Sequence, residues 1–146
     1  MKKLYIVLMV IGLMLTSCEL ETSNNGDLDG YWHLVRVDTL ATGGVCDMSE
    51  ARVFWGAQVR LIEAVDHDND SRHYGYLFKF EKKESMLRLY YAHRHNREEG
   101  DILVEDVREI SSLGVNSLDD TFLIEQLNSS NMTIVDDLLR LSFVKM

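Results

Sequence analysis

Two stretches decide the fold of this chain: residues 30–37, GYWHLVRV, and residues 52–62, RVFWGAQVRLI. Successive side chains of a β-strand point to opposite faces, so the apolar residue at every second position of the longer stretch predicts a strand with one buried face. The shorter stretch is apolar on both faces, which predicts a strand that is fully covered or bulged. The alternating face of the longer stretch consists of Val53, Trp55, Ala57, Val59 and Leu61.

Similar short apolar runs follow along the chain, separated by clusters of Gly, Asp, Asn and Ser. This pattern is typical of an all-β barrel or sandwich. Parallel strands need long crossover helices, and the sequence has none of that length, so the strands are expected to be antiparallel and in sequence order. The further strands are expected at 75–81, 86–91, 102–104, 121–127, 132–135 and 138–144, with a long loop at 41–50 and a polar turn at 66–73.

These runs give about eight strands, the number at which a sheet can close into an up-and-down barrel. One short helical segment is expected near residues 106–113, because apolar residues recur there every three positions. Asp106 and Glu109 have the spacing of a capping box, and Gly114 can end the turn. We expect one or two helical turns.

The N-terminal residues have the pattern of an export signal. Two lysines are followed by a twelve-residue apolar run, Leu4 to Leu15, which is too short to cross a membrane. The run ends in Leu15-Thr16-Ser17-Cys18, which resembles the lipobox of bacterial lipoproteins. The resemblance implies that residues 1–17 are a lipoprotein signal peptide and that the mature chain begins at a lipidated Cys18. An ordinary secretory signal with a chance cysteine is the alternative.

Residues 18–29 are polar and rich in Asn, which predicts a flexible tether before a barrel domain at 30–146. Two or more acyl chains on Cys18 give stable membrane anchoring. Glu19 stands where an aspartate is associated with retention in the inner membrane. The resemblance therefore favours the cell envelope, at the outer membrane of a Gram-negative bacterium.

The charge of the chain excludes two classes of partner. The formal net charge is −9, and removing residues 1–17 takes away Lys2 and Lys3 and no acid, which makes it −11. Nucleic acids and anionic lipid surfaces select basic patches, so neither is expected as a partner. With Cys18 lipidated, Cys46 has no second cysteine for a disulfide, so the domain must depend on its core.

Gly30-Tyr31-Trp32 is a Gly-x-Trp at the start of the first expected strand. Together with the lipobox and the strand of Trp55, it resembles small bacterial lipocalin-like lipoproteins. The resemblance implies that Trp32 closes one end of an eight-stranded barrel beneath a late arginine, for which Arg140 is the candidate. The domain is shorter than a typical lipocalin, so the resemblance leaves open whether its interior is a cavity or is filled.

Candidate metal sites are weak. His93 and His95 lie two residues apart, and His67, His73, Asp66 and Asp68 lie in another charged segment. Both segments are turn-like, where histidine is ordinarily solvated, and no cysteine pair supports zinc. Asp66, Asp68 and Asp70 have the initial spacing of a calcium loop, but Ser71 replaces its glycine and Leu77 its closing glutamate. No metal or cofactor is expected.

Candidate catalytic groups are weak as well. The doublets Glu98-Glu99, Asp119-Asp120 and Asp136-Asp137 place neighbours on opposite faces of a strand, so they suit turns better than a glycosidase pair. Cys46 stands beside Asp47, whose charge would raise the pKa of a thiol. We therefore expect no catalytic residue and no enzyme.

Two functions remain. In the first, the barrel binds a small, largely apolar molecule that contacts inward aromatic residues, for which Trp55, Tyr76, Phe78 and Tyr91 are the candidates. In the second, the chain is an envelope interaction module with a filled barrel, whose loops contact a protein partner that the sequence does not identify. A cavity below about 300 Å³ would favour the second function.

Overall fold

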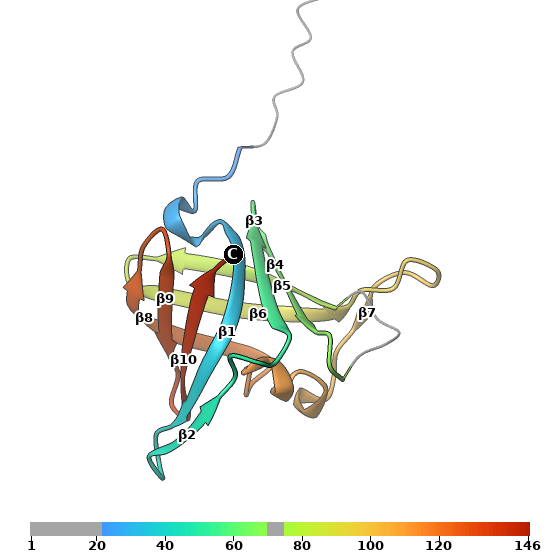
Figure 1. Cartoon of the computed structure of the whole chain (residues 1–146). Helices are drawn as coiled ribbons and strands as arrows, with labels where there is room; N and C mark the ends of the chain where they lie inside the picture. Colours follow the sequence, from blue (N-terminus) through green and yellow to red (C-terminus); the bar gives the residue numbers. More distant parts are fainter. Residues whose placement is uncertain (1–21, 70–74) are drawn as a thin grey trace, which may run out of the picture.

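Antiparallel strands form the framework of the computed structural model, which describes residues 22–69 and 75–146 (Figure 1). Three short 3₁₀ turns accompany the strands. The strands are β1 (Gly30–Thr39), β2 (Gly44–Asp47), β3 (Val53–Gln58), β4 (Leu61–Asp66), β5 (Tyr76–Lys83), β6 (Met86–Arg94), β7 (Ile102–Leu103), β8 (Asp119–Leu127), β9 (Asn131–Val135) and β10 (Leu139–Lys145). The 3₁₀ turns are η1 (Gly26–Leu28), η2 (Val107–Glu109) and η3 (Ser111–Leu113).

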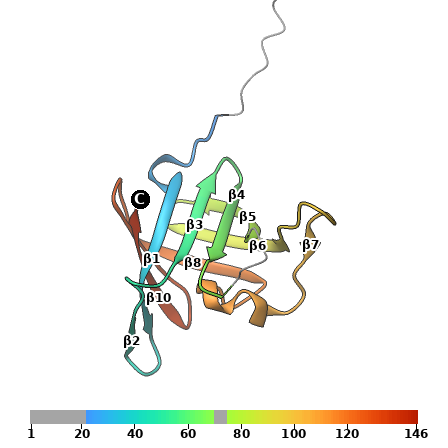
Figure 2. The ribbon, with the colours of Figure 1, turned by 45° about the vertical axis from the view of Figure 1, so that its right-hand side comes forward.

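Eight of the strands close into an antiparallel barrel in the order β1, β3, β4, β5, β6, β8, β9 and β10, as the sequence predicts. The last strand pairs with the first, from Trp32 opposite Lys145 to Thr39 opposite Leu139. Two short strands lie outside this closed path: β2 extends the far half of β1, and β7 pairs with the end of β6. Figures 1 and 2 both show the β1–β2 hairpin projecting below the barrel.

The prediction of a single strand at 52–62 is wrong, because this segment belongs to a hairpin of two strands. β3 ends at Gln58, and β4 begins at Leu61 and continues to Asp66. The turn between them places Val59 at φ 54°, which is unusual for a β-branched residue. The apolar alternation continues through this turn, so the sequence pattern does not show it. The segment near 102, expected as one of the eight strands, contributes only β7.

The barrel interior is filled with side chains. Trp55 packs against Phe143, with ring centroids 4.9 Å apart, and against Phe122 at 6.2 Å. Walls of a cavity that admits water would keep accessible surface, yet the largest core side chains have almost none, which indicates close packing. The side chains below 2% exposure include Trp32, Trp55, Phe78, Phe122, Phe143, Leu28, Leu34, Ile62, Leu87, Leu89, Ile110 and Leu113.

Short 3₁₀ turns cover both ends of the barrel (Figures 1 and 2). At one end, the carbonyl of Leu28 in η1 accepts a hydrogen bond from Trp32 Nε1 at 2.8 Å. At the other end, the carbonyl of Leu113 in η3 accepts from Trp55 Nε1 at 3.1 Å. The helical segment expected near 106–113 is therefore confirmed as two turns, which Gly114 ends at φ 86°.

The end of the expected tether is part of the barrel. Leu28 is buried, and Lys145 Nζ donates to the carbonyl of Asp27 at 2.9 Å. Asn25 Nδ2 donates to the carbonyl of Val59 at 2.9 Å, which joins this segment to the β3–β4 turn. Cys18 and the expected signal peptide lie outside the described residues. Within the described ranges, no helix has the length and apolar character needed to cross a membrane.

Candidate functional site

The four aromatic residues expected to line a ligand do not share a cavity. Trp55 and Phe78 are each 1% exposed and belong to the packed core. Tyr76 is partly buried at the edge of that core. Tyr91 is 59% exposed, so its expected inward position is wrong.

A β-bulge explains the position of Tyr91. Leu77 pairs with His93 and Lys79 pairs with Tyr90, so Phe78 alone faces two residues of β6, Tyr91 and Ala92. The extra residue reverses the alternation of β6, and Ala92 takes the inward position. Tyr91 adopts φ 51° and turns its ring to the outer face.

Trp32 is fully buried at one end of the barrel, as expected, but Arg140 is not its partner. Arg140 lies opposite Asp38, at the other end of the β1–β10 ladder, and forms two hydrogen bonds with Glu125, each of 2.9 Å. The cation over Trp32 is Lys145, whose Nζ lies 4.8 Å from the ring centroid. Antiparallel pairing sets this choice, since it places the end of the last strand beside the start of the first.

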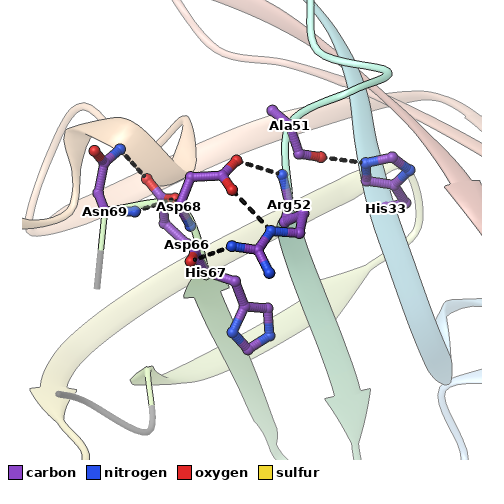
Figure 3. Close-up of polar contacts among 7 residues, drawn as sticks. All are labelled: His33, Ala51, Arg52, Asp66, His67, Asp68 and Asn69. Atoms are coloured by element: carbon purple, nitrogen blue, oxygen red, sulfur yellow. Dashed lines mark hydrogen bonds and ion pairs between the residues drawn. The ribbon is translucent and has the colours of Figure 1, made fainter. Parts of the chain in front are cut away.

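The carboxylates at the end of β4 and just after it accept hydrogen bonds from groups of the protein itself (Figure 3). Asp66 accepts hydrogen bonds from the backbone N–H groups of Asp68 and Asn69. Asp68 accepts from the backbone N–H and the Nε of Arg52, both at 2.8 Å. Asp70, Ser71 and His73 lie outside the described residues. These carboxylates therefore stabilise the turn that follows β4 and hold it against Arg52, the residue before β3.

The remaining candidates of the sequence are dispersed. His93 Nδ1 lies 2.7 Å from the carbonyl oxygen of Tyr91, and His95 Nδ1 lies 3.5 Å from a carboxylate oxygen of Glu63. Cys46 is exposed on β2. Within residues 22–69 and 75–146, no three His, Cys, Asp or Glu side chains are grouped closely enough to hold a metal ion.

Two of the acidic doublets, Glu98-Glu99 and Asp136-Asp137, lie in turns, as their sequence suggests, whereas Asp119-Asp120 begins β8. Asp120 accepts hydrogen bonds from the backbone N–H groups of Asn116 and Ser117. Asp136 accepts from those of Leu138 and Leu139. Burial, above all, raises the pKa of Asp120, against the effect of these bonds.

A groove of about 940 Å³ lies on the outer face of the barrel wall, beside the N-terminal segment. Cross-strand pairing aligns Tyr31 of β1, Gly56 of β3, Glu63 of β4 and Leu77 of β5 in one row across this wall. Outward side chains of the row and of the β3–β4 turn form most of its walls. The groove is lined by Ser23, Asp29, Gly30, Tyr31, Gly56, Ala57, Gln58, Val59, Arg60, Leu61, Glu63 and Leu77.

Gly56 gives the Tyr31 ring room to lean over this row. It is the one member of the row without a side chain, and a Cβ there would lie 3.3 Å from Tyr31 Cδ2. A glycine inside a strand often marks a site where another group approaches closely. Gly56 is therefore the signal from which the groove could have been suspected, although the sequence alone does not show its cross-strand neighbours.

Tyr31 and Glu63 face each other across Gly56. Burial, and then the negative charge of Glu63, raise the pKa of Tyr31 above its ordinary value. The Tyr31 ring stacks on Phe54 of the same outer face, with centroids 5.2 Å apart and planes 12° from parallel. The groove therefore combines an aromatic wall with an acidic group inside it.

A second, smaller pocket of about 420 Å³ lies between β6, β7 and the start of β8. Tyr91, Leu103 and Leu118 line it, and all three are exposed. At its edge, Arg88 forms two hydrogen bonds with Asp119, of 2.7 and 2.6 Å. Neither pocket contains Trp32, Trp55, Phe122 or Phe143 of the core.

Comparison with solved structures supports the barrel. A lipocalin-like protein from Bacteroides uniformis is similar over 83% of this chain and 100% of its own, with a TM-score of 0.63 and 20% identity. An uncharacterized protein from Bacteroides eggerthii is similar over 81% of this chain and 98% of its own, with a TM-score of 0.57 and 16% identity. At these identities the likeness shows the fold alone.

Sequence comparison gives the family. No curated protein matches this chain. The model of the lipocalin-like domain family matches residues 13–146, which include the whole barrel and the Gly-x-Trp of its first strand. The chain therefore belongs to the lipocalin-like domain family.

Proposed function

We propose that this chain is a lipid-anchored, non-catalytic binding protein of the cell envelope, and that its apolar ligand occupies the outer groove. The observation that carries the proposal is the contrast between the packed interior and the open groove of about 940 Å³. Ligand sites usually have volumes of about 300–1,000 Å³ and mostly apolar walls. The groove fits this description.

The place of the groove suits a membrane-bound protein. Ser23 lines the groove and stands five residues after Cys18. Five extended residues span at most about 18 Å, so a lipid on Cys18 would hold the groove close to the bilayer surface. A ligand that enters from the membrane would then have a short path.

The anchor is tested by replacing Cys18 with alanine. The unaltered protein is expected to begin at Cys18, to carry acyl mass, and to sediment with outer membranes. The Cys18→Ala protein is expected to leave the membrane fraction, because no acyl chain can then be attached. Intact-mass spectrometry and fractionation measure both results, and a variant that stays with the membrane would contradict the anchor.

The groove is tested by replacing Gly56 with valine. The added methyl groups would meet the Tyr31 ring and displace it within the groove, and the affinity for the neutral apolar dye N-phenyl-1-naphthylamine is expected to fall at least tenfold. Gly44→Val is the matched control, since Gly44 is also a strand glycine and lies outside the groove. Fluorescence titration measures both. Equal loss in the two variants, or binding by neither the variants nor the unaltered protein, would contradict the groove.

The absence of catalysis is tested by a screen of esters and glycosides. Turnover that disappears when a histidine or an acid is replaced would contradict the non-catalytic assignment.

A second candidate function is an envelope interaction module, which the smaller pocket favours. Its rim exposes Tyr91, Leu103 and Leu118 by 59, 49 and 38%, and exposed apolar residues that gather together often mark protein contacts. A photo-crosslinker at Leu103 would then capture one defined protein in cells. A crosslinker at Leu123 of β8, which is 45% exposed and lies outside this pocket, would not.

A further inference from the structure

We propose that the groove selects ligands in which an apolar chain ends in a positively charged ammonium group, and that Glu63 holds this group. This inference rests on the proposed function and adds the chemical class of its ligand. The carboxylate of Glu63 supplies the negative charge, and the apolar walls around it supply the site for the chain.

Glu63 occupies the centre of the groove. It lies between Gly56 and Leu77 in the cross-strand row, and its side chain is 43% exposed. In the part of the chain that the structure describes, one basic group approaches its carboxylate within 4 Å, His95 at 3.5 Å. Because its side chain is 43% exposed, the carboxylate can accept a further hydrogen bond or contact a cation from the ligand.

Tyr31 adds an aromatic group on the other side of Gly56. The charge of Glu63 contributes to the raised pKa of the Tyr31 phenol, which places the two groups within electrostatic reach of each other. A cation between them would interact with the carboxylate and with the electron-rich ring. An anion in the same place would be repelled by the carboxylate.

The other charges of the groove agree with this choice. Asp29 and Arg60 also line it, so with Glu63 the groove has two carboxylates and one guanidinium. The whole chain carries a net charge of −9, which attracts cations and repels anions at long range. The chain of the ligand has apolar walls to contact, since Val59, Leu61 and Leu77 line the groove near Glu63.

The experiment compares three probes with the same ten-carbon chain: decyltrimethylammonium, decyl maltoside and decanoate, each below its micelle concentration. Each probe competes with N-phenyl-1-naphthylamine for the chain from residue 18 carrying Cys18→Ala, which keeps every described residue. The ammonium probe is expected to displace the dye at a concentration at least tenfold below that of decanoate, with the maltoside between them.

The decisive variant is Glu63→Gln, which is expected to reduce the preference for the ammonium probe at least fivefold, while Glu63→Asp keeps most of it. Glu105→Gln is the matched control, because it removes the same charge from an exposed residue outside the groove. Far-UV circular dichroism confirms that each variant is folded.

The possible outcomes separate this inference from the proposed function. If the dye binds and the three probes compete equally, or if Glu105→Gln acts like Glu63→Gln, the ammonium preference is overturned and the groove remains. If the dye does not bind at all, the proposed function is overturned and the inference with it.

Discussion

Replacement of Trp32 by alanine is expected to lower the free energy of unfolding by about 3–5 kcal/mol, the usual cost of truncating a buried tryptophan. Trp32 has no exposed surface, and its Nε1 donates to the carbonyl of Leu28. Alanine would leave a cavity and an unpaired carbonyl beneath η1. A small domain is stable by only about 5–15 kcal/mol, so the loss would be large in a urea unfolding curve.

Two further variants separate the contributions to this loss. Trp32→Phe keeps most of the ring but removes the N–H, so it is expected to cost less than Trp32→Ala. A double-mutant cycle of Trp32→Ala with Lys145→Ala is expected to show coupling of about 0.5–2 kcal/mol, because Lys145 lies over the ring. With Arg140→Ala the losses should add. Coupling to Arg140 instead of Lys145 would contradict the register of β1 and β10.

Replacement of Trp55 by alanine is expected to cost a similar amount, about 3–5 kcal/mol, and to create a new interior site. Trp55 packs on Phe122 and Phe143 and donates to the carbonyl of Leu113. An apolar cavity made in a packed core can stay dry and bind a molecule such as benzene. Benzene should therefore raise the melting temperature of Trp55→Ala by more than that of the unaltered protein.

This second prediction distinguishes a filled barrel from a barrel that binds ligand inside. In a ligand-binding barrel, Trp55 would line an existing cavity, and its truncation would cost little stability. Such a result, together with benzene binding to the unaltered protein that Gly56→Val does not weaken, would restore the interior as the binding site.

The features that the sequence predicts correctly depend on local pattern. The alternation in β3 places Val53, Trp55 and Ala57 on the buried face, and the Gly-x-Trp at residues 30–32 predicts the burial of Trp32. Closure of the barrel is predicted from the number of strands, because a sheet of eight strands can close and leave no edge unpaired. These features need no knowledge of which residues lie opposite each other.

The features that it misses depend on pairing between distant residues. Tyr91 faces outward because β5 and β6 shift register by one residue, which only the pairing shows. Val59 begins a turn within a continuous apolar alternation, so the pattern gives no reason to end a strand there. Lys145 replaces Arg140 as the partner of Trp32 because the register of the first and last strands decides which cation meets the ring.

The position of the groove could not be predicted from the sequence for the same reason. Tyr31, Gly56, Glu63 and Leu77 come from four strands, and three separate registers bring them into one row. Moreover, the Tyr31 ring leans toward Gly56 because Gly56 has no side chain, and a missing side chain makes no apolar pattern. The acid and the aromatic ring were visible in the sequence, but their proximity was not.

The pairing of β1 with β10 determines when the barrel can close during synthesis. The last strand of the barrel, β10, is the neighbour of the first, β1. The barrel therefore cannot close until β10 has left the ribosome. Until β10 arrives, β1 and β9 each present an unpaired edge that can join another chain. Loss of β10 would therefore turn a closed barrel into an open sheet, whose two free edges can pair with other chains.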